Sequence, residues 1–174
     1  NKDPRSFVRC TVREGDEYIF TDVGVHLKGA AGSFRPVNDR PALTLNFDKY
    51  REKQKCHGLD KIHLNNSVQD NSYLCEYVAS GLFNAAGVPA PRVSHARVWL
   101  NGRDLGFYVL KEGFDTQFMR AHFGSKHGTF YDGGFCADID QRKDRKIGSG
   151  TNDQADLKGL VAAAREPDLV KRAA

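Results

Sequence analysis

The sequence predicts an α+β domain, an antiparallel sheet with one long packed helix, followed by a short helical segment. Several short segments alternate apolar and polar residues, which is the pattern of strands with one buried face. One longer segment instead places apolar residues three or four positions apart, as an amphipathic helix requires. The dipeptide Asn101-Gly102 separates two of the strand-like segments, and this pair favours a tight antiparallel hairpin.

Composition and charge exclude several classes of protein. Lys and Arg number 26 against 22 Asp and Glu, so the net charge is only +4, and it is spread along the chain. No nucleic-acid partner is therefore expected. Hydrophobic residues make up 40% of the chain, which is enough for a packed core and argues against disorder. No run of 18 apolar residues occurs, so no membrane span is expected.

The cysteines and histidines follow no metal-binding motif. The four cysteines, Cys10, Cys56, Cys75 and Cys136, are widely separated and contain no C-x-x-C pair, so a thiolate metal site is not expected. Two disulfides are possible in a secreted chain, although isolated cysteines in a domain of this size are more often small buried residues. The six histidines lack H-E-x-x-H spacing, and none is assigned to catalysis.

Strands separated by loops are expected before the long helix. Residues 16–28 alternate, which predicts two short strands or one strand with a break at Thr21-Asp22. Two further strands are predicted at residues 42–47 and 59–64. The connections are a loop rich in Gly and Pro at residues 28–41 and a charged, solvated segment at residues 48–58.

The long helix is predicted over residues 71–86. Asp70-Asn71-Ser72 is a start signal, and Gly87 followed by Pro89 ends the segment. Four apolar residues at spacings of four, four and three define the face expected to be buried, namely Leu74, Val78, Leu82 and Ala85.

After the helix, a hairpin is expected from residues 92–100 and 105–110, followed by a short helix capped by Asp115. Residues 138–153 are strongly charged and are expected to be mobile, and another helix is predicted at residues 154–164. The composition changes near Phe135, so the sequence divides into residues 1–135 and residues 136–174.

One segment has the character of an anion site. Glycines at positions 29 and 32 leave backbone N–H groups uncovered beside basic side chains, and phosphate oxygens bind both kinds of donor. The residues concerned are Lys28, Gly29, Gly32, Ser33, Arg35 and Arg40. The segment matches neither the Walker A motif nor G-x-G-x-x-G. The alternative is an ordinary surface loop with solvated basic residues.

Two acids could complete such a site. Glu76 lies within the predicted helix and could orient a phosphate-binding cation, either Lys28 or Arg40; the alternative is a solvated helix residue. Glu112 follows the last hairpin strand, where its backbone could meet adenine as a hinge does, or could simply end the strand. Asp138 and Asp140 form a D-x-D pair, for which a solvated loop is favoured over a metal site.

Three motifs together resemble a known family. They are D-x-S-x-L at residues 70–74, G-x-P-x-P at residues 87–91, and the hairpin N-G followed by G-x-Y-x-L-x-E at residues 101–112. With these motifs, residues 22–133 resemble the spore-coat CotH family of atypical, secretory-pathway protein kinases. The resemblance implies a kinase-like small lobe with its hinge at residues 1–135, and the start of a large lobe at residues 136–174.

The resemblance also implies an activity, the transfer of phosphate from ATP, with Mg²⁺, to Ser or Thr of protein substrates. By position, residues 28–35 would cover the phosphates, Arg40 would stand where the family usually has lysine, Glu76 would be the helix acid, and Glu112 would lie at the hinge. The family's catalytic and metal-binding aspartates have no counterpart before Ala174. No catalytic or metal residue is therefore assigned, and negligible kinase activity is expected of this chain alone.

The alternative function is a non-catalytic surface or spore-coat module that binds proteins on the same scaffold. The resemblance suggests secretion or a place in the cell envelope.

Overall fold

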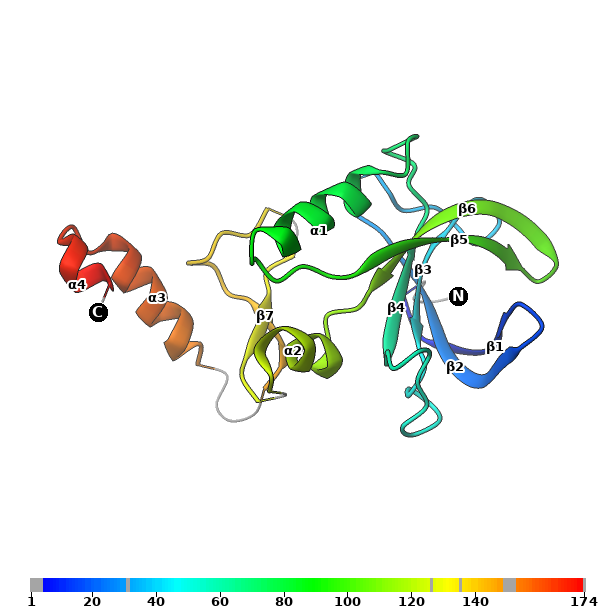
Figure 1. Ribbon diagram of the computed structural model, residues 1–174, viewed down its shortest axis with the longest axis horizontal. Helices are drawn as coiled ribbons and strands as arrows, with labels where there is room; N and C mark the ends of the chain where they lie inside the picture. The colour runs from blue at the N-terminus through cyan, green and yellow to red at the C-terminus, as the bar shows by residue number, and fades with distance from the viewer. Residues whose placement is uncertain (1–4, 31, 126, 135, 149–152, 174) are drawn as a thin grey trace. The chain divides into compact units, whose positions relative to one another are not determined.

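A computed structural model describes residues 5–173, apart from residues 31, 126, 135 and 149–152 (Figure 1). The chain forms two compact units, Asn1–Lys126 and His127–Ala174. The α+β class is confirmed, because the structure combines a curled antiparallel sheet with few helices. The assignment of a small lobe and a partial large lobe stays a prediction.

The first unit is built on a six-stranded antiparallel sheet with strand order β1-β2-β3-β4-β6-β5. Neighbours in sequence are also neighbours in the sheet, except that β4 pairs with β6 and leaves β5 at the edge. The strands are β1 (Val8–Glu14), β2 (Tyr18–Lys28), β3 (Ala42–Asn46), β4 (Lys61–Asn65), β5 (Val93–Leu100) and β6 (Arg103–Glu112).

Strand β2 is continuous, with an irregularity at the expected break. Cys10 pairs with Val23 and Val12 with Phe20, so β2 contributes one more residue than β1 between these pairs. Asp22 has a positive φ of 56°, which is typical of a β-bulge. Strand β1 was not predicted from the sequence.

The β5–β6 hairpin turns at Asn101 and Gly102, as predicted. Their φ angles are 51° and 79°, and two successive positive values are what a type I′ turn requires. Asn and Gly tolerate this region, so the dipeptide determines the turn.

Helix α1 (Cys75–Ala85) begins later than predicted. One carboxylate oxygen of Asp70 accepts from the Cys75 N–H at 2.9 Å, and the other accepts from the Ser72 N–H at 3.0 Å. The Asp70 carboxylate therefore stabilises the turn before the helix and also bonds Cys75, the first residue of the helix.

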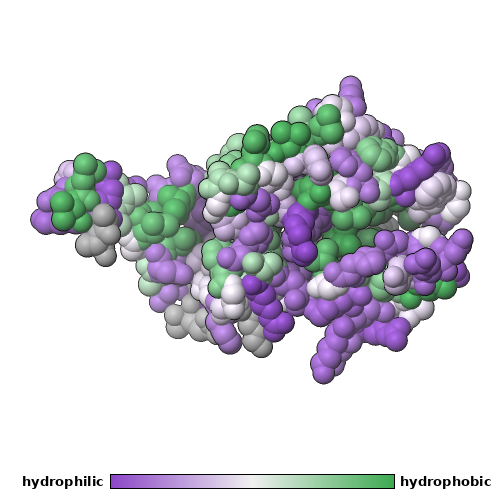
Figure 2. All heavy atoms as spheres, in the orientation of Figure 1, coloured by the Kyte–Doolittle hydropathy of each residue, from purple (hydrophilic) through white to green (hydrophobic). Residues whose placement is uncertain are grey.

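The predicted buried face of α1 was wrong. Leu74, Val78 and Leu82 are 51%, 49% and 67% exposed, and Figure 2 shows hydrophobic residues over this helix. Ser80 is instead the buried residue of the helix, and its hydroxyl donates to the Pro91 carbonyl. Asn84 bonds both backbone groups of Ala90. Ser80 and Asn84 face inward because the backbone groups that they bond, those of Ala90 and Pro91, lie on that side of the helix.

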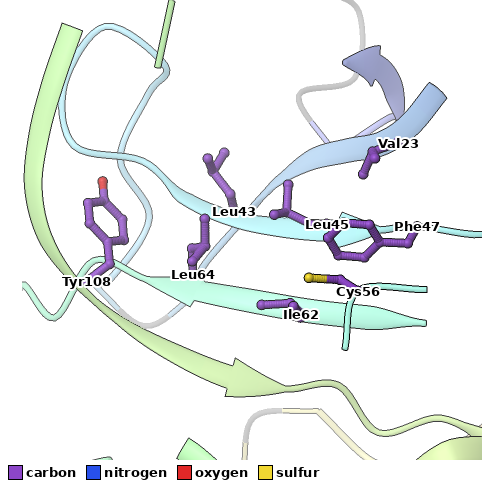
Figure 3. Packing of buried hydrophobic residues seen from close by; sticks show 8 residues of the cluster. All are labelled: Val23, Leu43, Leu45, Phe47, Cys56, Ile62, Leu64 and Tyr108. Atoms are coloured by element: carbon purple, nitrogen blue, oxygen red, sulfur yellow. The ribbon is translucent and has the colours of Figure 1, made fainter. Parts of the chain in front are cut away.

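The hydrophobic core lies against one face of the curled sheet (Figure 3). Leu43 pairs with Leu64 and Leu45 with Ile62, so these side chains lie on the same face. Burying each such side chain contributes about 1.5–3 kcal/mol, which fixes the strand register because a one-residue shift would expose the whole set. The cluster comprises Val23, Leu43, Leu45, Phe47, Cys56, Ile62, Leu64 and Tyr108.

Helix α2 (Thr116–Phe123) also belongs to the first unit. Asp115 caps it as predicted, because its carboxylate accepts from the N–H groups of Gln117 and Phe118. None of the described helices is long and apolar enough to cross a membrane.

The second unit contains a two-stranded sheet and two helices, β7 (Phe130–Asp132), β8 (Asp144–Ile147), α3 (Ala155–Arg165) and α4 (Leu169–Ala173). The helix predicted at residues 154–164 is confirmed as α3. The charged run at residues 138–153 contains β8, whereas its residues 149–152 lie outside the described part.

Candidate functional site

The face of the sheet opposite the core is polar. Along β3, β4 and the second half of β2 the polar residues alternate with apolar ones, and their pairing crosses the sheet to Lys111 of β6. His26 pairs with Thr44, Thr44 with His63, and His63 with Lys111, so these four side chains form one row on the polar face. The sheet thereby presents several nitrogen-bearing groups together.

A chain of polar contacts joins this face to helix α1. Lys28 Nζ donates to Asn65 Oδ1 at 2.5 Å, and Asn65 Nδ2 donates to Glu76 Oε1 at 2.6 Å. The other Glu76 oxygen, Oε2, lies 3.1 Å from Lys111 Nζ. We call Lys28, Asn65, Glu76 and Lys111 the lysine–glutamate network. It ties two cations, from β2 and β6, to one helix carboxylate.

The electrostatics of the network follow from burial. Burial lowers the pKa of Lys28 to about 8, although Glu76 opposes the shift, and Lys111 adds to it. Burial also lowers the pKa of His63 to about 3, and Lys28, Lys61 and Lys111 reinforce that change. His63 is therefore neutral at pH 7, with Nδ1 3.0 Å from Thr44 Oγ1. Two lysines, Lys28 and Lys111, act on the single carboxylate of Glu76, so the face favours an anion.

The loop after Lys28 is held by its own hydrogen bonds. Gly29 has a φ of 119°, and a Cβ there would lie 2.8 Å from Phe34 Cα, so this position requires glycine. Ser33 Oγ donates to the Ala30 carbonyl at 2.7 Å. Arg35 donates to the Gly32 and Phe34 carbonyls at 2.8 Å, so its guanidinium is used within the loop.

Comparison with protein families identifies the chain. The family model described as CotH kinase protein matches residues 25–166, which is more than half of the sequence. The chain belongs to the CotH family. The resemblance inferred from the motifs is thereby confirmed, and CotH membership points to a kinase-like spore-coat protein. The family name implies the use of ATP and metal only in general terms. No curated protein matches the chain.

In this CotH chain, Arg40 does not join the lysine–glutamate network. Its guanidinium lies over the rings of Tyr73 and Tyr108, at 5.4 and 5.1 Å from their centroids, and donates to the Phe107 carbonyl. The cation that contacts Glu76 directly is Lys111.

Glu112 lies on the core face of the sheet. It pairs with Ile62, its side chain is 1% exposed, and its Oε1 accepts from Arg92 at 3.0 Å. Its backbone N–H donates to the Arg92 carbonyl at 3.0 Å, so that donor is already in use. The structure brings together Lys28 and Glu76 of the predicted residues, and it engages Arg35, Arg40 and Glu112 elsewhere.

Several residues of the polar face were not predicted as site residues, among them Asn65, His63 and Lys111. A signal for two of them was present, because the segment Lys61-Ile62-His63-Leu64-Asn65 alternates strictly and places its polar residues on one face. Lys111 gave no such signal, because residues 107–110 of β6 are all apolar and do not alternate. The contact of Asn65 and Lys111 with Glu76 depends on how α1 packs on the sheet, which the local sequence does not predict.

Proposed function

We propose that this CotH chain forms a kinase-like small lobe that binds the phosphates of ATP on the polar face of its sheet. The lobe would serve an enzyme that transfers phosphate to Ser or Thr of protein substrates. The single observation that carries this proposal is the lysine–glutamate network. In protein kinases an ion pair between a strand lysine and a helix glutamate holds the cation against the α- and β-phosphates. The contact between Lys111 and Glu76 has this form.

Lys28 supplies the second cation. It ends β2 immediately before the loop at residues 29–35, and its ammonium is partly buried and contacts Asn65. A phosphate close to this group would favour its charged form, since an opposite charge raises a depressed lysine pKa. Lys28 and Lys111 would thus contact the phosphates while Glu76 keeps both in place.

The network does not fit a magnesium site. Mg²⁺ binds through carboxylates and phosphate oxygens. Glu76 is the one carboxylate of the network, and its two oxygens are engaged by Asn65 and Lys111. Phosphate transfer therefore needs metal ligands beyond these four residues, and we assign no step of the reaction to them.

Titration with ATP, with and without Mg²⁺, tests the proposal on the full chain. We expect ATP to raise the melting temperature, because a ligand that binds only the folded state stabilises it. Lys28→Ala and Lys111→Ala should abolish the shift. Lys55→Ala, which removes a lysine paired with Asp60 outside the network, should keep it.

The same titration separates the proposal from its alternative. A non-catalytic protein-binding module would show no shift at millimolar ATP. A shift of equal size in the wild type and in both network variants would also contradict the assigned residues.

A further inference from the structure

A second cluster of reactive side chains lies outside the lysine–glutamate network. Glu14 ends β1, and Cys56 and His57 lie in the connection between β3 and β4. Their ligand atoms, one carboxylate oxygen, Sγ and one ring nitrogen, all lie within 4.8 Å of one another. Within the described part of the chain, this is the one group of three or more His, Cys, Asp or Glu side chains so close together.

A tight turn holds two of the three residues. Cys56 and Leu59 exchange both backbone hydrogen bonds at 2.9 Å, so His57 and Gly58 form a two-residue turn. Their φ angles of 48° and 82° are those of a type I′ turn. The Tyr18 ring packs against the edge of the His57 ring at 5.2 Å, which restrains the imidazole. Cys56 itself is anchored in the core and is only 6% exposed.

The Glu14 carboxylate contacts both other residues of the cluster, and a bound ion would replace these contacts. Glu14 Oε2 lies 2.7 Å from His57 Nε2 and 3.9 Å from Cys56 Sγ. Around a tetrahedral Zn²⁺, such ligand atoms would be roughly 3.4–3.6 Å apart, given the usual bond lengths. Small rotations of the Glu14 side chain, which is half exposed, would produce this spacing.

We propose that Glu14, Cys56 and His57 bind a zinc ion. One sulfur, one nitrogen and one oxygen donor suit zinc, whereas magnesium and calcium prefer oxygen alone. The side chains of Glu14 and His57 are 52% and 54% exposed, which leaves an open position for water as a fourth ligand. The ion would join the end of β1 to the connection between β3 and β4, and would so stabilise the sheet.

Binding must release a proton. Cysteine binds zinc as the thiolate, so zinc binding would replace the Cys56 thiol proton with a Zn–S bond. The released proton can be measured by calorimetry in two buffers of different ionisation enthalpy.

The test uses the full chain with the exposed thiols removed by Cys75→Ser and Cys136→Ser. We expect one Zn²⁺ per chain with release of protons, and Co²⁺ should produce a thiolate-to-metal charge-transfer absorption. His57→Asn keeps a residue that tolerates the left-handed turn but removes the imidazole. We expect this variant and Glu14→Gln to weaken zinc binding by at least about tenfold, since even loss of a residue supporting a ligand has that effect.

Glu17→Gln, which changes an acid in the turn between β1 and β2, is the matched control and should leave zinc affinity unchanged. Absence of the charge-transfer absorption overturns the proposal, as does equal affinity in His57→Asn, Glu14→Gln and the control. Cys56→Ala should abolish the absorption. Should that core substitution unfold the protein, the two surface variants still decide the question.

Discussion

Lys28 is a residue whose pKa the fold lowers strongly. Lys28 ends β2, and its ammonium contacts the neutral side-chain amide of Asn65. The Glu76 carboxylate contacts the other side of that amide. Desolvation outweighs the attraction of Glu76, so the folded state binds the Lys28 proton less tightly than the unfolded chain does. That imbalance makes stability depend on pH.

The contribution of Lys28 to stability should rise as the pH increases above about 8. The unfolded chain keeps the Lys28 proton up to the ordinary lysine value of 10.5, whereas the folded state loses it near 8. The cost of burying the charge is fully present below pH 8 and disappears between these values. Urea unfolding of the wild type and of Lys28→Met at pH 7 and pH 10 measures this. The difference between the two proteins should shift in favour of the wild type at pH 10, and a constant difference would contradict the assignment.

Glu76 should matter more through its charge than through its hydrogen bonds. Glu76→Gln keeps an oxygen acceptor but leaves Lys28 and Lys111 without a counter-charge. Because the carboxylate is one-third exposed, we expect a loss of about 1 kcal/mol in unfolding free energy, which is less than a fully buried charged hydrogen bond contributes. Chemical denaturation measures the loss. Unchanged or increased stability of this variant would show that the network does not hold α1.

Helix α1 differs from the usual amphipathic helix because its polar residues carry its attachment. Glu76, Ser80 and Asn84 recur every four positions, so they lie on one face, and each contacts the sheet or the segment that follows the helix. The aromatic rings of Tyr77 and His95 add a contact with β5, 5.6 Å between centroids. The apolar residues of α1 therefore contribute little to the stability of the described chain.

Substitutions on the two faces of α1 should differ in effect. Leu82→Gln should change the unfolding free energy by no more than about 0.5 kcal/mol, because Leu82 is 67% exposed. Ser80→Ala should cost about 1–3 kcal/mol, because it leaves the buried Pro91 carbonyl without its donor. Denaturant unfolding of both variants gives the comparison. The opposite order would mean that the apolar face is the packed one.

At the scale of the molecule, one sheet serves three purposes. Its inner residues form the core, its polar face carries the lysine–glutamate network, and the end of β1 contributes to the proposed zinc site. All three depend on the same strand register, since adjacent residues on a strand point to opposite faces. A change in the core should therefore affect the first unit as a whole.

The substitution of Ile by Val at one core position and at one exposed position tests the assignment of the strand faces. Ile62→Val, at a position 5% exposed in the core, should cost about 0.5–1.5 kcal/mol of unfolding free energy. Ile19→Val, at a position 52% exposed on β2, should change it by less than about 0.5 kcal/mol. Far-ultraviolet circular dichroism during urea unfolding reports both. Equal losses would show that the strand faces are assigned incorrectly.

Local signals predicted most of the elements well. The Asn101-Gly102 turn, the Asp115 cap and the break at Thr21-Asp22 each depend on residues adjacent in sequence, and each is present in the structure. The exposed face of α1 was not predictable in this way, because spacing shows which residues share a face but not which face meets a partner.

The sequence by itself determined the antiparallel strands, the hairpin, the position of Glu76 on a helix and membership of the CotH family. Only the tertiary structure decided that Lys111 meets Glu76, that Glu112 faces the core, and that Glu14 reaches Cys56 across 42 positions of sequence. The physical reason is that backbone conformation follows from neighbouring residues, whereas contacts between side chains follow from strand register and packing, to which the whole chain contributes.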